Sequence, residues 1–108
     1  EIDSVGGVTF RNFGRVHSDK QFDIYVLLRE RNGVGRDYTF VVRTFDENFK
    51  VIDSYELASW IDAENQYCFG SINADLIIKK SCDNGEVKDV KQIVNGGRIV
   101  ATSFHGRE

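Results

Sequence analysis

The sequence contains no proline and no methionine, and only two cysteines and one tryptophan among its 108 residues. Leu and Ala together supply only 8 positions, so the residues that most favour helices are scarce. No run of about 18 apolar residues is present, and no basic segment leads into an apolar one as in a signal peptide. These absences exclude a helical bundle, a coiled coil and a transmembrane helix within this chain.

An excess of positive charge is also missing. The 17 acidic residues outnumber the 14 Lys and Arg, giving a formal net charge of −3. Basic residues accompany aromatic ones near Arg11 and Arg15, but acidic neighbours dilute their field, so we expect no nucleic-acid partner. The two cysteines do not settle the redox compartment, because a secreted protein could hold one bridge and a cytosolic protein two thiols.

What the sequence does have is β-branched side chains. Val and Ile supply 21 positions and aromatic residues 12% of the chain, a composition that suits pleated sheets. The length predicts a single domain over residues 1–108, and no linker or repeat divides it.

Strand-sized runs alternate with polar breaks along the whole chain. Bulky apolar groups occur on both faces, as where Tyr25 and Leu27 alternate with Ile24 and Val26, so we expect parts of both faces to be covered. The pattern predicts an all-β antiparallel meander of about seven strands that forms a partial barrel or two-layer sandwich. The expected strands are residues 8–16, 21–29, 38–45, 49–55, 67–82, 86–94 and 98–104.

The strongest turn signal is Asp83-Asn84-Gly85, which predicts a hairpin with Lys80 opposite Asp89 and Leu76 opposite Ile93. If residues 67–82 form one long strand, Cys68 and Cys82 lie about 45 Å apart at about 3.3 Å per residue. We therefore expect no disulfide between them, unless a break near Asn73 folds the segment into a hairpin.

Three segments resemble small secreted or lipid-anchored β domains of Bacteroidetes that lack an assigned function. The segments are RTFDENFKVIDS at 43–54, GSINADLII at 70–78 and NGGRIV at 95–100. The resemblance implies a β-meander located in the periplasm, anchored to the outer membrane or extracellular, with any lipid anchor upstream of this chain. It carries over no catalytic residue. One departure is Phe49, which stands where those domains often carry glycine.

Catalytic and metal-binding constellations are not recognisable. His17 and His105 lie at opposite ends of the chain, Cys68 lacks the surroundings of an activated nucleophile, and no Gly-x-Ser-x-Gly motif is present. Paired acids fall in predicted turns, where solvation accounts for them. We therefore expect no enzyme activity, no metal and no cofactor.

The most distinctive polar–aromatic segment surrounds the single tryptophan. Residues 57–65 interrupt the β pattern and predict either a helical turn or a loop. Rigid rings on loops are typical anchors for partners, although Trp60 could instead plug the core. The predicted binding residues are four aromatic side chains within 15 positions: Tyr55, Trp60, Tyr67 and Phe69.

Together these features predict a noncatalytic envelope or secreted domain that binds a protein or glycan partner. The alternative is a carrier that holds a small apolar ligand in a barrel cavity. The sequence predicts neither the identity of the ligand nor the oligomeric state.

Overall fold

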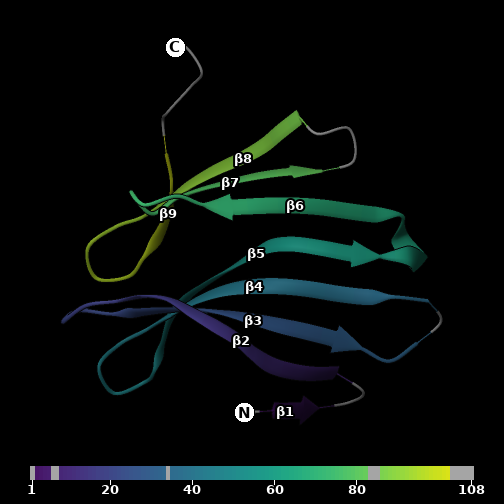
Figure 1. The fold of residues 1–108 in the computed structure, drawn as a ribbon, viewed down its shortest axis with the longest axis horizontal. Coiled ribbons are helices and arrows are strands. Elements are labelled where there is room, and N and C mark those ends of the chain that lie inside the picture. The colour runs from purple at the N-terminus through teal and green to yellow at the C-terminus, as the bar shows by residue number, and fades with distance from the viewer. Residues whose placement is uncertain (1, 6–7, 34, 83–85, 103–108) are drawn as a thin grey trace.

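The computed structural model describes residues 2–5, 8–33, 35–82 and 86–102, and all their strands join one antiparallel sheet (Figure 1). The strands pair in chain order from β1 to β9, which confirms the all-β meander. Their bounds are β1 Ile2–Val5, β2 Val8–Ser18, β3 Asp23–Arg31, β4 Asp37–Phe45, β5 Val51–Ile61, β6 Gln66–Ile72, β7 Ile77–Cys82, β8 Glu86–Ile93 and β9 Ile99–Ala101. Among the described residues, no helix is long and apolar enough to cross a membrane.

The described residues form two strands more than the seven expected. One is β1, and the other arises because the single long strand predicted over residues 67–82 is wrong. A turn after Asn73 divides that segment into β6 and β7. The side-chain oxygen of Asn73 accepts hydrogen bonds from the backbone N–H groups of Asp75 (2.9 Å) and Ile77 (3.0 Å). This Asx turn outweighs the alternating apolar pattern because it satisfies backbone donors locally.

The turn places Cys68 directly opposite Cys82, and the two form a disulfide. Their Cα atoms are 3.9 Å apart, so the expectation of two unbonded cysteines is also wrong. That expectation assumed one extended strand over residues 67–82, but the chain reverses after Asn73.

Three of the turns share one hydrogen-bonding plan. Asp46, Asn73 and Val94 each donate a backbone N–H to the carbonyl four residues later and accept one from the residue three later. The residue before the last has a positive φ in each turn: 62° at Phe49, 62° at Leu76 and 84° at Gly97. Glycine adopts that conformation readily, whereas Phe and Leu do so under strain.

The hairpin between β7 and β8 has the expected register on its flanks. Lys80 pairs with Asp89, and Ile93 donates its N–H to the carbonyl of Leu76 over 3.0 Å. The predicted turn residues 83–85 lie outside the described residues.

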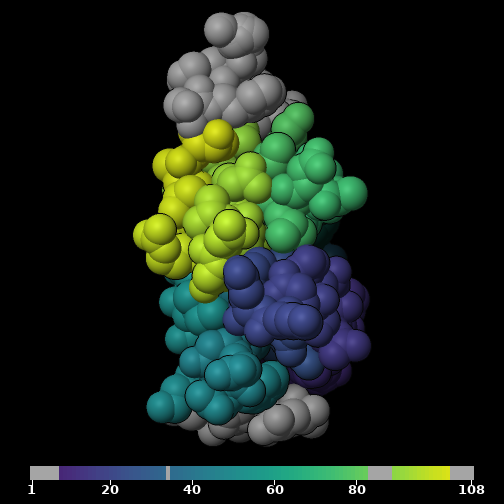
Figure 2. All heavy atoms as spheres, turned by 90° about the vertical axis from the view of Figure 1, so that its left-hand side faces the viewer, coloured from purple at the N-terminus to yellow at the C-terminus, as the bar shows by residue number. Residues whose placement is uncertain are grey.

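The sheet curls but does not close into a barrel (Figure 1). At one end of the strands, the β2–β3, β4–β5 and β8–β9 connections gather side by side (Figure 2). Two hydrogen bonds hold the β8–β9 connection in place: Thr44 of β4 donates its hydroxyl to the carbonyl of Gly97 (2.6 Å), and Gly96 donates its N–H to the side chain of Gln21 in the β2–β3 connection (3.3 Å). The core lies on the inner face of this curve and comprises Phe22, Ile24, Val42, Leu57, Ile78 and Ile93.

Candidate functional site

Trp60 lies near the end of strand β5 and not in an irregular segment as its sequence suggested. Within residues 57–65, all of which the structure describes, only Asp62–Glu64 forms a helical turn, a single turn of 3-10 helix between β5 and β6. Trp60 is 36% exposed as a residue, so it neither plugs the core completely nor stands free in solvent.

Asp62 connects the groups around Trp60. Its Oδ1 accepts hydrogen bonds from the indole N–H of Trp60 and the hydroxyl of Tyr67, both 3.1 Å long. Its Oδ2 accepts the backbone N–H of Arg36 at 2.9 Å and the guanidinium Nε–H at 3.2 Å. The guanidinium carbon of Arg36 also lies 4.8 Å from the centre of the Trp60 ring system, at cation–π distance. One carboxylate thus fixes three side chains from three parts of the chain.

These hydrogen bonds lower the pKa of Asp62. The backbone N–H of Arg36 contributes most, burial acts in the opposite direction, and the Arg36 and Tyr67 side chains add to the lowering. The carboxylate therefore stays ionised at neutral pH and keeps accepting all four hydrogen bonds.

Trp60 also belongs to a cross-strand row. It pairs with Tyr38 on β4 and with Tyr67 on β6, and the Trp60 and Tyr67 ring centres are 4.7 Å apart. Tyr38 is 36% exposed, like Trp60, so the row presents aromatic surface to solvent across three strands. We call Tyr38, Trp60 and Tyr67 the aromatic row. Sequence reasoning missed Tyr38, because its membership depends on the strand pairing.

The other two predicted binding residues lie differently. Phe69 is 57% exposed and follows Tyr67 by two positions on β6, so alternation places both on the same side of that strand. Tyr55 packs against the core, and its hydroxyl donates to Asp89 over 2.6 Å. Burial, followed by that carboxylate, raises the pKa of Tyr55. The structure thus brings Trp60 and Tyr67 into contact but directs Tyr55 to a separate interaction.

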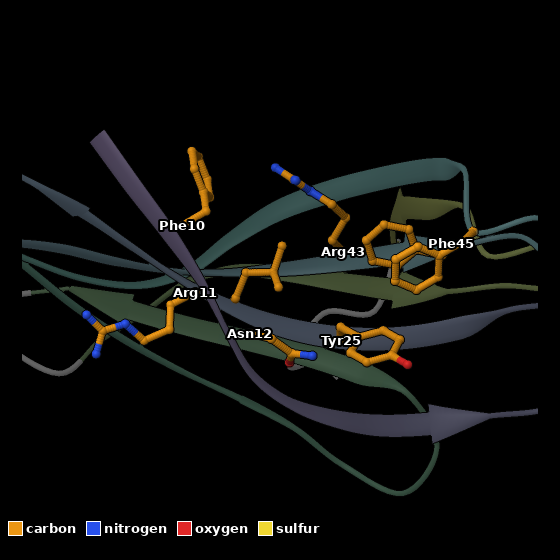
Figure 3. Close-up of a pocket in the computed structure, with 8 residues that line it drawn as sticks. Phe10, Arg11, Asn12, Tyr25, Arg43 and Phe45 are labelled. Atoms are coloured by element: carbon orange, nitrogen blue, oxygen red, sulfur yellow. The ribbon is translucent and has the colours of Figure 1, made fainter. Parts of the chain in front are cut away.

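A second feature lies on the opposite face of β4. Successive side chains of a strand alternate between faces, so Tyr38 is on one face and Arg43 and Phe45 are on the other. That second face carries a hollow of about 240 Å³, open to solvent, which we call the aromatic hollow (Figure 3). Its lining residues are Phe10, Arg11, Asn12, Tyr25, Leu27, Arg43, Phe45 and Phe49.

Three rings form one wall of the aromatic hollow. Phe45 and Phe49 stack with ring centres 4.5 Å apart and planes 8° from parallel. Tyr25 meets both edge-on, at 5.6 Å from Phe45 and 5.7 Å from Phe49. Such geometry is favourable between aromatic quadrupoles, so the three rings support one another.

Arg43 provides the positive charge of the hollow. Its Nε–H donates to the hydroxyl of Ser54 over 3.0 Å, and its guanidinium carbon lies 5.6 Å from the Phe10 ring centre. Arg11, by contrast, points away from the hollow (Figure 3) and pairs with Glu30 at 2.8 Å. Of the two lining arginines, only Arg43 therefore offers its guanidinium to a ligand in the hollow.

Among the described residues, no group of three or more His, Cys, Asp or Glu side chains comes close enough to hold a metal ion. Cys68, considered from sequence as a nucleophile, is bonded to Cys82 and has no thiol to react.

No protein-family model, no curated protein and no solved structure matches this chain.

Proposed function

We propose that this chain is a noncatalytic binding domain of the cell envelope or of a secreted protein, and that the aromatic row contacts its protein or glycan partner. The observation that carries the proposal is a partly exposed tryptophan that contacts Asp62, Arg36 and Tyr67. A side chain that is already ordered loses little conformational entropy on binding. Tryptophan and tyrosine dominate the energetics of many interfaces because each provides a large apolar area with one polar atom.

The disulfide supports the proposed location. Disulfides persist in the periplasm and outside the cell, and are rare in reducing cytosol. A bridge between Cys68 and Cys82 is therefore consistent with an envelope or extracellular domain.

The alternative function, a carrier of small apolar ligands, receives less support. It calls for an enclosed apolar interior, and the sheet of the described residues is open. The aromatic hollow, at about 240 Å³, is smaller than the ~300–1,000 Å³ of typical drug-sized ligand pockets. A larger hollow of about 430 Å³, whose lining includes Val26, Leu57 and Leu76, is also open to solvent, so a lipid chain would remain largely exposed in either.

The proposal can be tested with Trp60→Ala and a control, Val51→Ala. Val51 is 54% exposed at the opposite end of the same strand, so the control removes exposed apolar surface away from the aromatic row. Wild type and both variants are applied to an immobilised panel of envelope glycans. A photo-cross-linking amino acid at position 38 tests for a protein partner in the producing cells.

We expect Trp60→Ala to weaken the interaction by about 2 kcal/mol, as for an interface anchor, and Val51→Ala to leave it unchanged. Binding that survives Trp60→Ala at full strength contradicts the role of the aromatic row. A panel without binding and a position-38 cross-linker that captures nothing would contradict the proposed function.

A further inference from the structure

We propose that the aromatic hollow is a second binding site, which takes one hexuronic acid residue, a six-membered sugar ring bearing a carboxylate. It is independent of the aromatic row, because the two features occupy opposite faces of β4. The proposal follows from the size, charge and polarity of the hollow and from the backbone conformation of Phe49.

The size of the hollow limits the ligand to one ring. Its volume is about 240 Å³, below the range of pockets that enclose drug-sized molecules. An open hollow of this size seats a single sugar residue while the rest of an oligosaccharide extends into solvent.

The charge of the hollow selects an anion. None of its eight lining residues is acidic, and among residues whose side chains the structure describes no carboxylate forms an ion pair with Arg43. Ser54 holds the Nε–H of Arg43, which leaves the terminal guanidinium nitrogens as donors. A carboxylate placed there would receive charge-assisted hydrogen bonds, which are stronger than those between neutral groups.

The remaining lining favours a sugar over an aromatic acid or a fatty acid. Asn12 extends its amide toward Tyr25, and both residues line the hollow (Figure 3). An amide offers both donors and acceptors, which suits the hydroxyl groups of a sugar. The wall formed by Tyr25, Phe45 and Phe49 provides apolar surface for the C–H face of the ring.

The backbone of Phe49 adds an independent observation. Its φ of 62° is strained for a bulky residue, and its side chain is 56% exposed. In the equivalent turns, Gly97 adopts positive φ without a side chain, and the Leu76 side chain packs against the core. Phe49 bears the same strain and is one of the residues that line the hollow, and strained residues of this kind cluster at functional sites.

The test uses trigalacturonate as the probe, at millimolar concentration, followed by chemical-shift changes in the protein's NMR spectrum. We expect shifts confined to β2, β3, β4 and the turn around Phe49, and saturation transfer from the rings to the sugar C–H protons. Galactose, which lacks the carboxylate, and benzoate, which lacks the sugar hydroxyls, are expected to bind at least about 10-fold more weakly, because each loses part of the recognition.

Two variants and one control locate the site. Arg43→Gln is expected to weaken trigalacturonate binding about 10-fold or more, whereas Arg98→Gln, which removes an exposed arginine from the β8–β9 turn, should not weaken it. Phe49→Asn removes the ring but keeps a residue that tolerates positive φ, and should weaken binding without unfolding the turn.

Several outcomes overturn the proposal. Equal affinity for galactose and trigalacturonate would show that the hollow does not recognise the carboxylate. Tighter binding of benzoate than of trigalacturonate would show that it does not recognise the sugar hydroxyls. If Arg43→Gln binds trigalacturonate as tightly as wild type, or if the chemical-shift changes centre on the aromatic row, the hollow is not the binding site. The aromatic row is tested separately with Trp60→Ala. A negative result for the aromatic hollow therefore does not contradict the proposed function of the aromatic row.

Discussion

Cys68 and Cys82 are direct cross-strand neighbours on β6 and β7, with Cα atoms 3.9 Å apart and a disulfide between them. The two cysteines are 14 positions apart in the sequence, and their disulfide closes a loop that contains the Asn73 turn. The covalent bond and the turn thus constrain the same hairpin.

Removing this disulfide should destabilise the domain. In the chain-entropy model, a loop of about 15 residues contributes about 3 kcal/mol by restricting the unfolded chain. We expect Cys68→Ala/Cys82→Ala to lower the free energy of unfolding by about that amount in chemical denaturation. Thiol titration of the unreduced, denatured protein should find no free thiols, and two free thiols per chain would contradict the pairing.

The Asp62 carboxylate should make the surroundings of Trp60 sensitive to acid. Its pKa is below 3.8 in the folded protein, so its stabilising effect is complete above the unfolded pKa and is lost as pH falls below 3.8 through the folded value. Because the chain has one tryptophan, its emission reports this site alone. Asp62→Asn should abolish the acid transition in emission. The control Glu64→Gln removes an acid from the same turn and should retain the acid transition. If the transition persists in Asp62→Asn, it arises from another group.

Glycine substitutions at Phe49 and Leu76 should differ in their effect on stability. Both residues have a φ of 62°, a conformation that costs a non-glycine residue roughly 1–2 kcal/mol. Phe49→Gly relieves that strain but gives up the ring contacts with Phe45 and Tyr25, so we expect the two effects to offset each other and stability to change little. Leu76→Gly loses a side chain packed on the core and should destabilise by about 2 kcal/mol. Equal losses in the two thermal midpoints would contradict the assignment of strain to Phe49.

Trp60→Ala should have an intermediate effect on stability. Trp60 is 36% exposed and its ring contacts Tyr67 and Arg36, so we expect a loss of about 2 kcal/mol, less than the roughly 3–5 kcal/mol of a fully buried aromatic residue. Acrylamide should quench the emission of the native protein partially. Emission fully protected from the quencher would show that Trp60 is core, and would remove the anchor from the proposed binding surface.

Local patterns in the sequence determined the fold class and much of the strand order. The alternation around Ile24 and Val26 and the breaks at glycine and Asx residues follow from neighbouring positions, and they gave the meander and the register of Lys80 with Asp89. The same local reasoning failed at residues 67–82. There the apolar alternation continues through Asn73, and only the hydrogen bonds of its side chain show that the chain reverses.

The tertiary structure alone decided which side chains meet. The disulfide, the aromatic row and the aromatic hollow all depend on pairing between strands and on which face each side chain occupies. Tyr38 is 22 positions from Trp60 and its direct neighbour on β4, whereas Tyr55 is 5 positions from Trp60 and bonds Asp89 instead. Sequence proximity predicts the geometry of a turn because a turn is closed by its own residues. It does not predict a surface assembled from strands, because small shifts such as the bulges in β5 change which residues lie opposite one another.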